Sequence, residues 1–199
     1  VYKRQGPLQG QVAEWFTRQA FALADIITIR DSGSKQLLER WGRPAIQTAD
    51  PVWCLESQPL PQALVSQLNC ISESELIGLS LRTSHNFGVE ELDELVAALS
   101  NALSENAHIL LLPLQSNEDK ELLAKFAGKW NLQGGKSTLI DTEALQYPSQ
   151  WISLFGRCKL VVAMRLHALI MALKAGVAVA GLAYDPKVTQ VLSDFEQPI

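Results

Sequence analysis

The sequence predicts an α/β fold, a Rossmann-like doubly wound parallel sheet, and two observations support this class. Apolar runs of strand length alternate with segments that have the spacing of a helix, and the alternation continues along most of the chain. Several of the runs are apolar throughout, which is typical of parallel strands that are covered on both faces. Repeated units of this kind form a parallel sheet with helices packed on it.

The first fifty residues predict two strand and helix units. Val12, Trp15 and Phe16 recur at helical spacing and mark one face of a helix. Pro51 disfavours helical backbone in the residue before it, so the second strand ends in a turn at Asp50. The expected elements are a helix over 11–23, a buried strand over 25–30, a helix over 34–41 that ends at Gly42, and a short strand over 46–49.

The remainder of the chain predicts a more regular alternation. Pro59 and Pro61 mark a loop over 56–61, and Gly134 and Gly135 mark a turn before a strand. The expected strands are 76–81, 108–114, 137–140, 159–163 and 177–182, and the expected helices are 89–103, 118–129, 148–155 and 166–174.

The domain organisation predicted from this pattern is simple. Residues 1–22 form a lead-in that contains the first helix, a remnant of an interdomain segment, and residues 23–199 form one Rossmann-like domain. No internal repeat, low-complexity segment or long linker divides the chain. Residues 1–5 contain basic side chains but no apolar segment follows them, so they do not form a secretion signal.

Composition excludes several function classes. The net charge of −4, from 17 basic and 21 acidic residues, does not favour a protein that binds duplex nucleic acid. Three cysteines without a C-x-x-C pair argue against a disulfide framework or a thiolate zinc site and fit a reducing cytoplasm. The uncharged apolar stretch 175–184 is about half of the ~20 residues that a membrane-spanning helix needs. No sequence motif indicates a metal ion or a cofactor.

Basic residues follow most of the predicted strands. In doubly wound sheets, ligands bind at the carboxyl ends of the strands, in the crevice where the strand order reverses. Arg165 and His167 also lie at the start of a helix, where backbone N–H groups and the helix dipole favour an anion. The strand-end candidates for binding a phosphate or a carboxylate are Arg30, Arg82, Arg165, His167 and Lys187.

Each candidate also has an ordinary structural interpretation. His167 could be a hydrogen-bonded core histidine, and Lys187 a surface lysine. Arg165 could cap a carbonyl group or pair with Asp185, and Arg30 could form an exposed pair with Asp31. The functional interpretation depends on several cations converging on one crevice. His85, in a polar loop, and His108, at the start of a strand, are not expected to be catalytic.

Four segments resemble a known family. They are ADIITIRDSGSKQLLERWG, TADPVW, IGLSLR and VVAMRLHALIMALKAGVAVAGLAYDPKV, and together they are similar to the polysaccharide pyruvyl transferases, in particular the CsaB-like members. The resemblance implies the C-terminal domain of a GT-B-type transferase, in which two Rossmann-like domains face a cleft. It also implies a missing N-terminal domain and a domain that is truncated at Ile199, before its closing helices.

The resemblance implies a transferase that moves a pyruvyl group from phosphoenolpyruvate to two hydroxyls of a sugar and so forms a pyruvate ketal. His167 would be the general acid, and Arg165, Lys187, Arg30 and Arg82 would hold the phosphate and the carboxylate. The acceptor would be a lipid-linked precursor of cell wall or exopolysaccharide, met at the cytoplasmic face of the inner membrane. The fragment alone would bind the donor weakly and turn over nothing.

Two other functions fit the same pattern. One is a GT-B glycosyltransferase that uses a nucleotide sugar, or a sugar-nucleotide epimerase, holding a nucleotide diphosphate on the same domain. The other is a non-catalytic ligand-binding α/β module, because a fold does not determine a function. A carboxylate placed for ribose hydroxyls would favour the first, and the sequence offers little support for one.

Overall fold

The computed structural model describes residues 10–71, 73–84, 87–182, 186–195 and 197. The chain divides after Pro51 into two compact units. The sequence analysis drew its boundary after residue 22 and grouped residues 23–51 with the large sheet. In the structure, residues 23–51 belong to the first unit. Their two strands pair with each other in a separate two-stranded sheet.

The first unit contains two helices and one pair of parallel strands. Asp31 caps the second helix, because its Oδ1 accepts a hydrogen bond of 2.7 Å from the N–H of Ser34. The strand predicted as buried over 25–30 is only two residues long, and neither of its residues is buried. The elements are α1 (Gln11–Ala22), β1 (Thr28–Ile29), α2 (Ser32–Arg40) and β2 (Ile46–Gln47).

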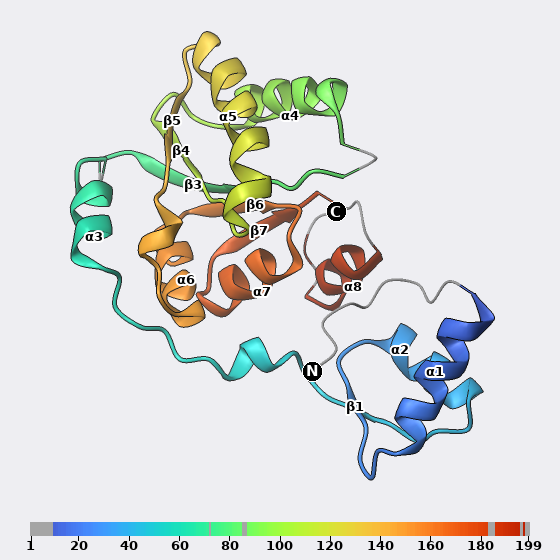
Figure 1. Ribbon diagram of the computed structural model, residues 1–199. Helices are drawn as coiled ribbons and strands as arrows, with labels where there is room; N and C mark the ends of the chain where they lie inside the picture. The colour runs from blue at the N-terminus through green and yellow to red at the C-terminus, as the bar shows by residue number, and fades with distance from the viewer. Residues whose placement is uncertain (1–9, 72, 85–86, 183–185, 196, 198–199) are drawn as a thin grey trace. The chain divides into compact units, whose positions relative to one another are not determined.

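The second unit is a five-stranded parallel sheet between two layers of helices (Figure 1). The predicted fold class is therefore confirmed. Its strands are β3 (Glu75–Ser80), β4 (Ala107–Leu111), β5 (Lys136–Leu139), β6 (Leu160–Ala163) and β7 (Ala178–Gly181). Its helices are α3 (Gln62–Asn69), α4 (Val89–Ala102), α5 (Ser116–Leu132), α6 (Pro148–Phe155), α7 (Leu166–Lys174) and α8 (Pro186–Asp194), with short 3-10 helices at η1 (Pro51–Cys54) and η2 (Thr142–Ala144).

The sheet is doubly wound. Its strand order is β5-β4-β3-β6-β7, so the chain runs outward from β3 on one side and then returns to β6 on the other. The register pairs Ser80, the last residue of β3, with Ala163, the last residue of β6. The two strands therefore end at the same level, and the point where the strand order reverses lies between them.

The two faces of the sheet bury separate apolar clusters. Successive side chains of a strand point to opposite faces, so Leu76 lies in one cluster and Ile77 in the other. The helices α4 and α5 cover one face, and α6, α7 and α8 cover the other (Figure 1). Gly78 of the central strand allows close packing, because a Cβ there would lie 3.1–3.2 Å from three core side chains.

Two helices of the second unit were not predicted. The segment that forms α3 is only eight residues long, and only Leu64 and Leu68 are buried, so its helical pattern is weak. The helix α8 follows the last strand and contributes Val188 and Leu192 to the core. Among the described residues, no helix has both the length and the apolar character needed to cross a membrane.

Candidate functional site

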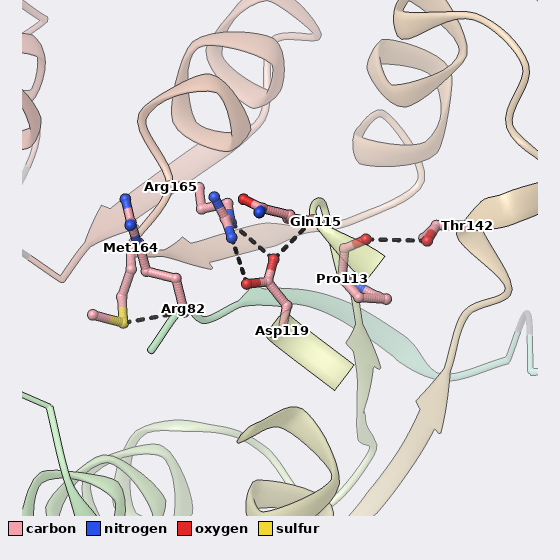
Figure 2. A network of polar contacts seen from close by, with 7 residues as sticks. All are labelled: Arg82, Pro113, Gln115, Asp119, Thr142, Met164 and Arg165. Carbon is pink, nitrogen blue, oxygen red and sulfur yellow. Dashed lines mark hydrogen bonds and ion pairs between the residues drawn. The ribbon is translucent and has the colours of Figure 1, made fainter. Parts of the chain in front are cut away.

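The candidate site lies where β3 and β6 end. Met164 follows β6 and donates its N–H to the carbonyl of Ser80 over 2.9 Å. Arg82, two residues beyond β3, donates its N–H to the sulfur of Met164 over 3.5 Å. The segments that carry Arg82 and Arg165 are therefore adjacent, and Figure 2 shows both arginine side chains at this end of the sheet. Two of the predicted residues thus lie at the point where the strand order reverses.

Arg165 is held by a carboxylate. Its Nε donates to Asp119 Oδ2 over 2.8 Å, and its second terminal nitrogen donates to Oδ1 over 2.5 Å. The Asp119 side chain is fully buried, whereas that of Arg165 is 15% exposed. Asp119 Oδ2 also accepts the N–H of Gln115 over 2.9 Å (Figure 2). Asp185, considered as an alternative partner, falls outside the described residues, and the partner found here is Asp119.

His167 lies in the first turn of α7, where Arg165 is the N-cap residue in an extended conformation. The first N–H groups of a helix point away from its body and toward any anion placed there. The carbonyl of Arg165 already accepts the N–H groups of Ala168 and Leu169. The side chain of His167 is exposed, so His167 is not a buried core histidine.

Lys187 and Arg30 follow strands other than β3 and β6. Lys187 is the second residue of α8, which follows β7, and its side chain lies outside the described part of the structure. Arg30 belongs to the first unit, where it follows β1 and forms an ion pair with Asp50, which follows β2. Asp31, the alternative partner considered for Arg30, accepts hydrogen bonds from Ser34 and caps α2.

The thiols offer no nucleophile at this edge. Burial raises the pKa of Cys158 to about 12, because a thiolate would lose its hydration beneath the sheet. Cys54 and Cys70 are exposed free thiols, one in η1 and one after α3. Among the described residues, no three histidine, cysteine or carboxylate side chains gather to hold a metal ion. Within the described ranges, the predicted candidates that follow β3 and β6 are Arg82, Arg165 and the exposed His167.

Asp119 is the site residue that the sequence analysis missed. It lies in the first turns of α5, not directly after a strand, so inspection of strand ends did not find it. A carboxylate close to the start of a helix is common and gives no distinctive signal. Its role depends on α5 and α7 lying on opposite faces of the sheet and meeting beyond the strand ends.

The family model for polysaccharide pyruvyl transferases matches residues 6–186. The chain is a member of this family. A search of the curated proteins found no match to it. The family match covers β3, β6 and α7 and includes Arg82, Arg165 and His167, whereas Lys187 lies one residue beyond it.

This pyruvyl transferase family member has a GT-B-type Rossmann-like fold, as the first of two similar solved structures shows. A proposed UDP-N-acetylglucosamine 2-epimerase from Listeria monocytogenes aligns with a TM-score of 0.64 and 13% identity, over 97% of this chain and 50% of that chain. Anabaena Alr3699/HepE in complex with UDP and glucose aligns with a TM-score of 0.49 and 15% identity, over 85% and 48%. The chain thus spans half the length of the first of these proteins.

Proposed function

We propose that the complete protein transfers a pyruvyl group from phosphoenolpyruvate to two hydroxyls of a sugar and forms a cyclic pyruvate ketal. The observation that carries the proposal is the family match together with Arg82, Arg165 and the exposed His167 at the end of β3 and β6. A donor with one phosphate and one carboxylate suits two arginines and a helix N-terminus.

The proposed reaction begins with a proton transfer. The His167 imidazolium donates a proton to the methylene carbon of the donor, which becomes a methyl group, and positive character develops at the adjacent carbon. One sugar hydroxyl adds to that carbon and returns its proton to the imidazole. The bond to phosphate then breaks, the second hydroxyl adds, and its proton leaves with the phosphate. The products are the ketal and inorganic phosphate.

Arg165 is proposed to bind the donor through the part of its guanidinium that Asp119 does not use. A guanidinium carries five N–H donors, and the Asp119 carboxylate takes up two of its nitrogens. The remaining donors are available to a phosphate or a carboxylate. Arg82 is proposed as the second cation for the donor, and Lys187 and Arg30 as further substrate-binding residues.

The whole protein is proposed to have features beyond this chain. They are an N-terminal Rossmann-like domain that completes a cleft, a lipid-linked sugar acceptor of a cell-wall or exopolysaccharide pathway, and a cytoplasmic location at the inner membrane face. The half-length alignment with the epimerase structure is compatible with a second domain. Residues 1–199 alone are proposed to be inactive, because one side of the cleft would be absent.

A second candidate is a nucleotide-sugar glycosyltransferase or epimerase. The similarity in fold to the Listeria protein favours this candidate. At 13% identity, this similarity shows a shared fold and not a shared function. The two candidates differ in what they consume. A pyruvyl transferase releases phosphate from phosphoenolpyruvate in the presence of a sugar, whereas the alternatives consume a nucleotide sugar.

The experiment that tests the proposal follows phosphate release by the complete protein. The wild type, His167→Ala and His108→Gln are incubated with phosphoenolpyruvate and a panel of lipid-linked or model amino sugars. His108→Gln is the matched control, because His108 is buried near the start of β4, at the amino ends of the strands and away from the candidate site. We expect acceptor-dependent release that falls about a hundredfold or more in His167→Ala and stays near wild type in His108→Gln.

Two results would contradict the proposal. Turnover of a nucleotide sugar, without release of phosphate from phosphoenolpyruvate for any sugar, would favour the glycosyltransferase or epimerase. A His167→Ala variant with wild-type turnover would remove His167 from the chemistry and leave it as a surface residue of α7.

A further inference from the structure

The ion pair between Arg165 and Asp119 joins the two helical layers beyond the carboxyl ends of the strands. Arg165 is the N-cap of α7, which packs on one face, and Asp119 lies in the first turns of α5, which packs on the other. The contact is made at two points, 2.8 Å at Nε and 2.5 Å at the terminal nitrogen. Two parallel hydrogen bonds fix the plane of a guanidinium as well as its position.

The burial of Asp119 makes this pair different from those on the surface. Its carboxylate is fully buried, so it needs partners for both oxygens. Arg165 supplies two hydrogen bonds and the Gln115 N–H supplies a third. The pair of Lys125 and Glu121, by contrast, joins two exposed side chains, which hold each other weakly in water. Asp119 therefore restrains Arg165 far more firmly than a surface carboxylate would.

From this geometry we infer that Asp119 is a positioning residue for the donor site, an inference that rests on the proposed function. The carboxylate holds one edge of the Arg165 guanidinium and leaves the other donors to meet the anionic donor. Because the side chain is fixed during folding, little conformational freedom is lost when the donor binds. Asp119 itself does not touch the substrate, and its effect passes through Arg165.

The test measures kcat and KM for phosphoenolpyruvate in the complete protein with a saturating acceptor. Asp119→Asn keeps an oxygen that can accept the Gln115 N–H but loses the charge and the two-point contact. We expect KM for the donor to rise and kcat/KM to fall about tenfold to a hundredfold, since small misplacements of a binding group have effects of this size. Thr142→Val is the control, because it removes a buried hydrogen bond to Pro113 at the same edge without touching Arg165.

A double-mutant cycle separates positioning from a general structural role. If Asp119 acts through Arg165, then Asp119→Asn adds nothing to Arg165→Gln, and the double variant matches Arg165→Gln within about twofold. Arg165→Lys gives an independent measurement if Asp119→Asn folds poorly. It keeps the positive charge beside Asp119 but cannot make the two-point contact, so we expect the same rise in KM.

Three results would overturn the inference. They are multiplicative effects of Asp119→Asn and Arg165→Gln, an equal loss in the Thr142→Val control, and a wild-type KM in Arg165→Lys. If the wild type itself releases no acceptor-dependent phosphate, the proposed function fails and the inference fails with it. Wild-type activity with one of the three results would overturn the inference alone.

Discussion

Replacing Arg165 by methionine would leave the Asp119 carboxylate buried with the Gln115 N–H as its remaining described hydrogen bond. Removing one partner of a buried ion pair typically costs about 3–5 kcal/mol, because the other charge stays out of water without compensation. The low end applies here, since the Arg165 side chain is 15% exposed and water can reach the site. We therefore expect Arg165→Met to lower the free energy of unfolding by about 3 kcal/mol.

Thermal unfolding followed by circular dichroism measures this change. For a chain of this length, 1 kcal/mol corresponds to about 2–4 °C, so the expected decrease in Tm is about 6–12 °C. The double variant Asp119→Leu with Arg165→Met removes both charges and should recover most of the loss. Lys125→Met is the matched control, because its exposed pair with Glu121 contributes at most about 1 kcal/mol.

Two results would refute this reasoning. An Arg165→Met variant with a Tm within about 2 °C of wild type would mean that the pair contributes no more than a surface pair. A double variant as unstable as the single one would mean that the loss comes from packing around the Arg165 side chain and not from the buried charge.

The sheet itself supports two further predictions. Gly78→Ala should lower the free energy of unfolding by about 1–3 kcal/mol, because the new methyl group would overpack the central strand. Gly128 lies in an exposed turn of α5 with open space around it, so Gly128→Ala should raise the free energy of unfolding by about 0.5–1 kcal/mol. Urea unfolding measures both changes. Burial, with Lys136 nearby, lowers the pKa of His108 below 6.5, so the unfolded chain binds a proton at higher pH than the folded chain. The stability that neutral His108 contributes is complete above pH 6.5 and is lost as the pH falls below that value. Urea unfolding on both sides of pH 6.5 should therefore show a smaller loss of stability on acidification in His108→Gln than in the wild type. An equal loss in the two proteins would contradict the assignment to His108.

Much of the second unit could be predicted from sequence because its elements carry strong local patterns. The helices over 148–155 and 166–174 were predicted with the bounds that the structure gives them. The strands over 76–81 and 159–163 agree within a residue, since each is a short apolar run between turn signals. The first unit was predicted less well, because periodicity identifies strands but does not say which sheet they join.

The candidate site also contains residues that local sequence patterns identify and one that they do not. Arg82, Arg165 and His167 were found from sequence, because a residue that follows a strand or begins a helix can be recognised locally. The partner of Arg165 could not be found in this way. Asp119 is 46 residues away along the chain, and nothing in its own segment marks it as different from any other carboxylate.

The sequence by itself determined the α/β class, the family and the cations that follow the strands, since each of these depends on residues close together in the chain. The tertiary structure decided which strands share a sheet, which cations lie at the point of reversal, and that Asp119 holds Arg165. These features depend on the crossover of the chain from β5 to β6 and on two helices meeting from opposite faces. Local patterns do not encode such long-range packing, because it is selected by burial over the whole domain.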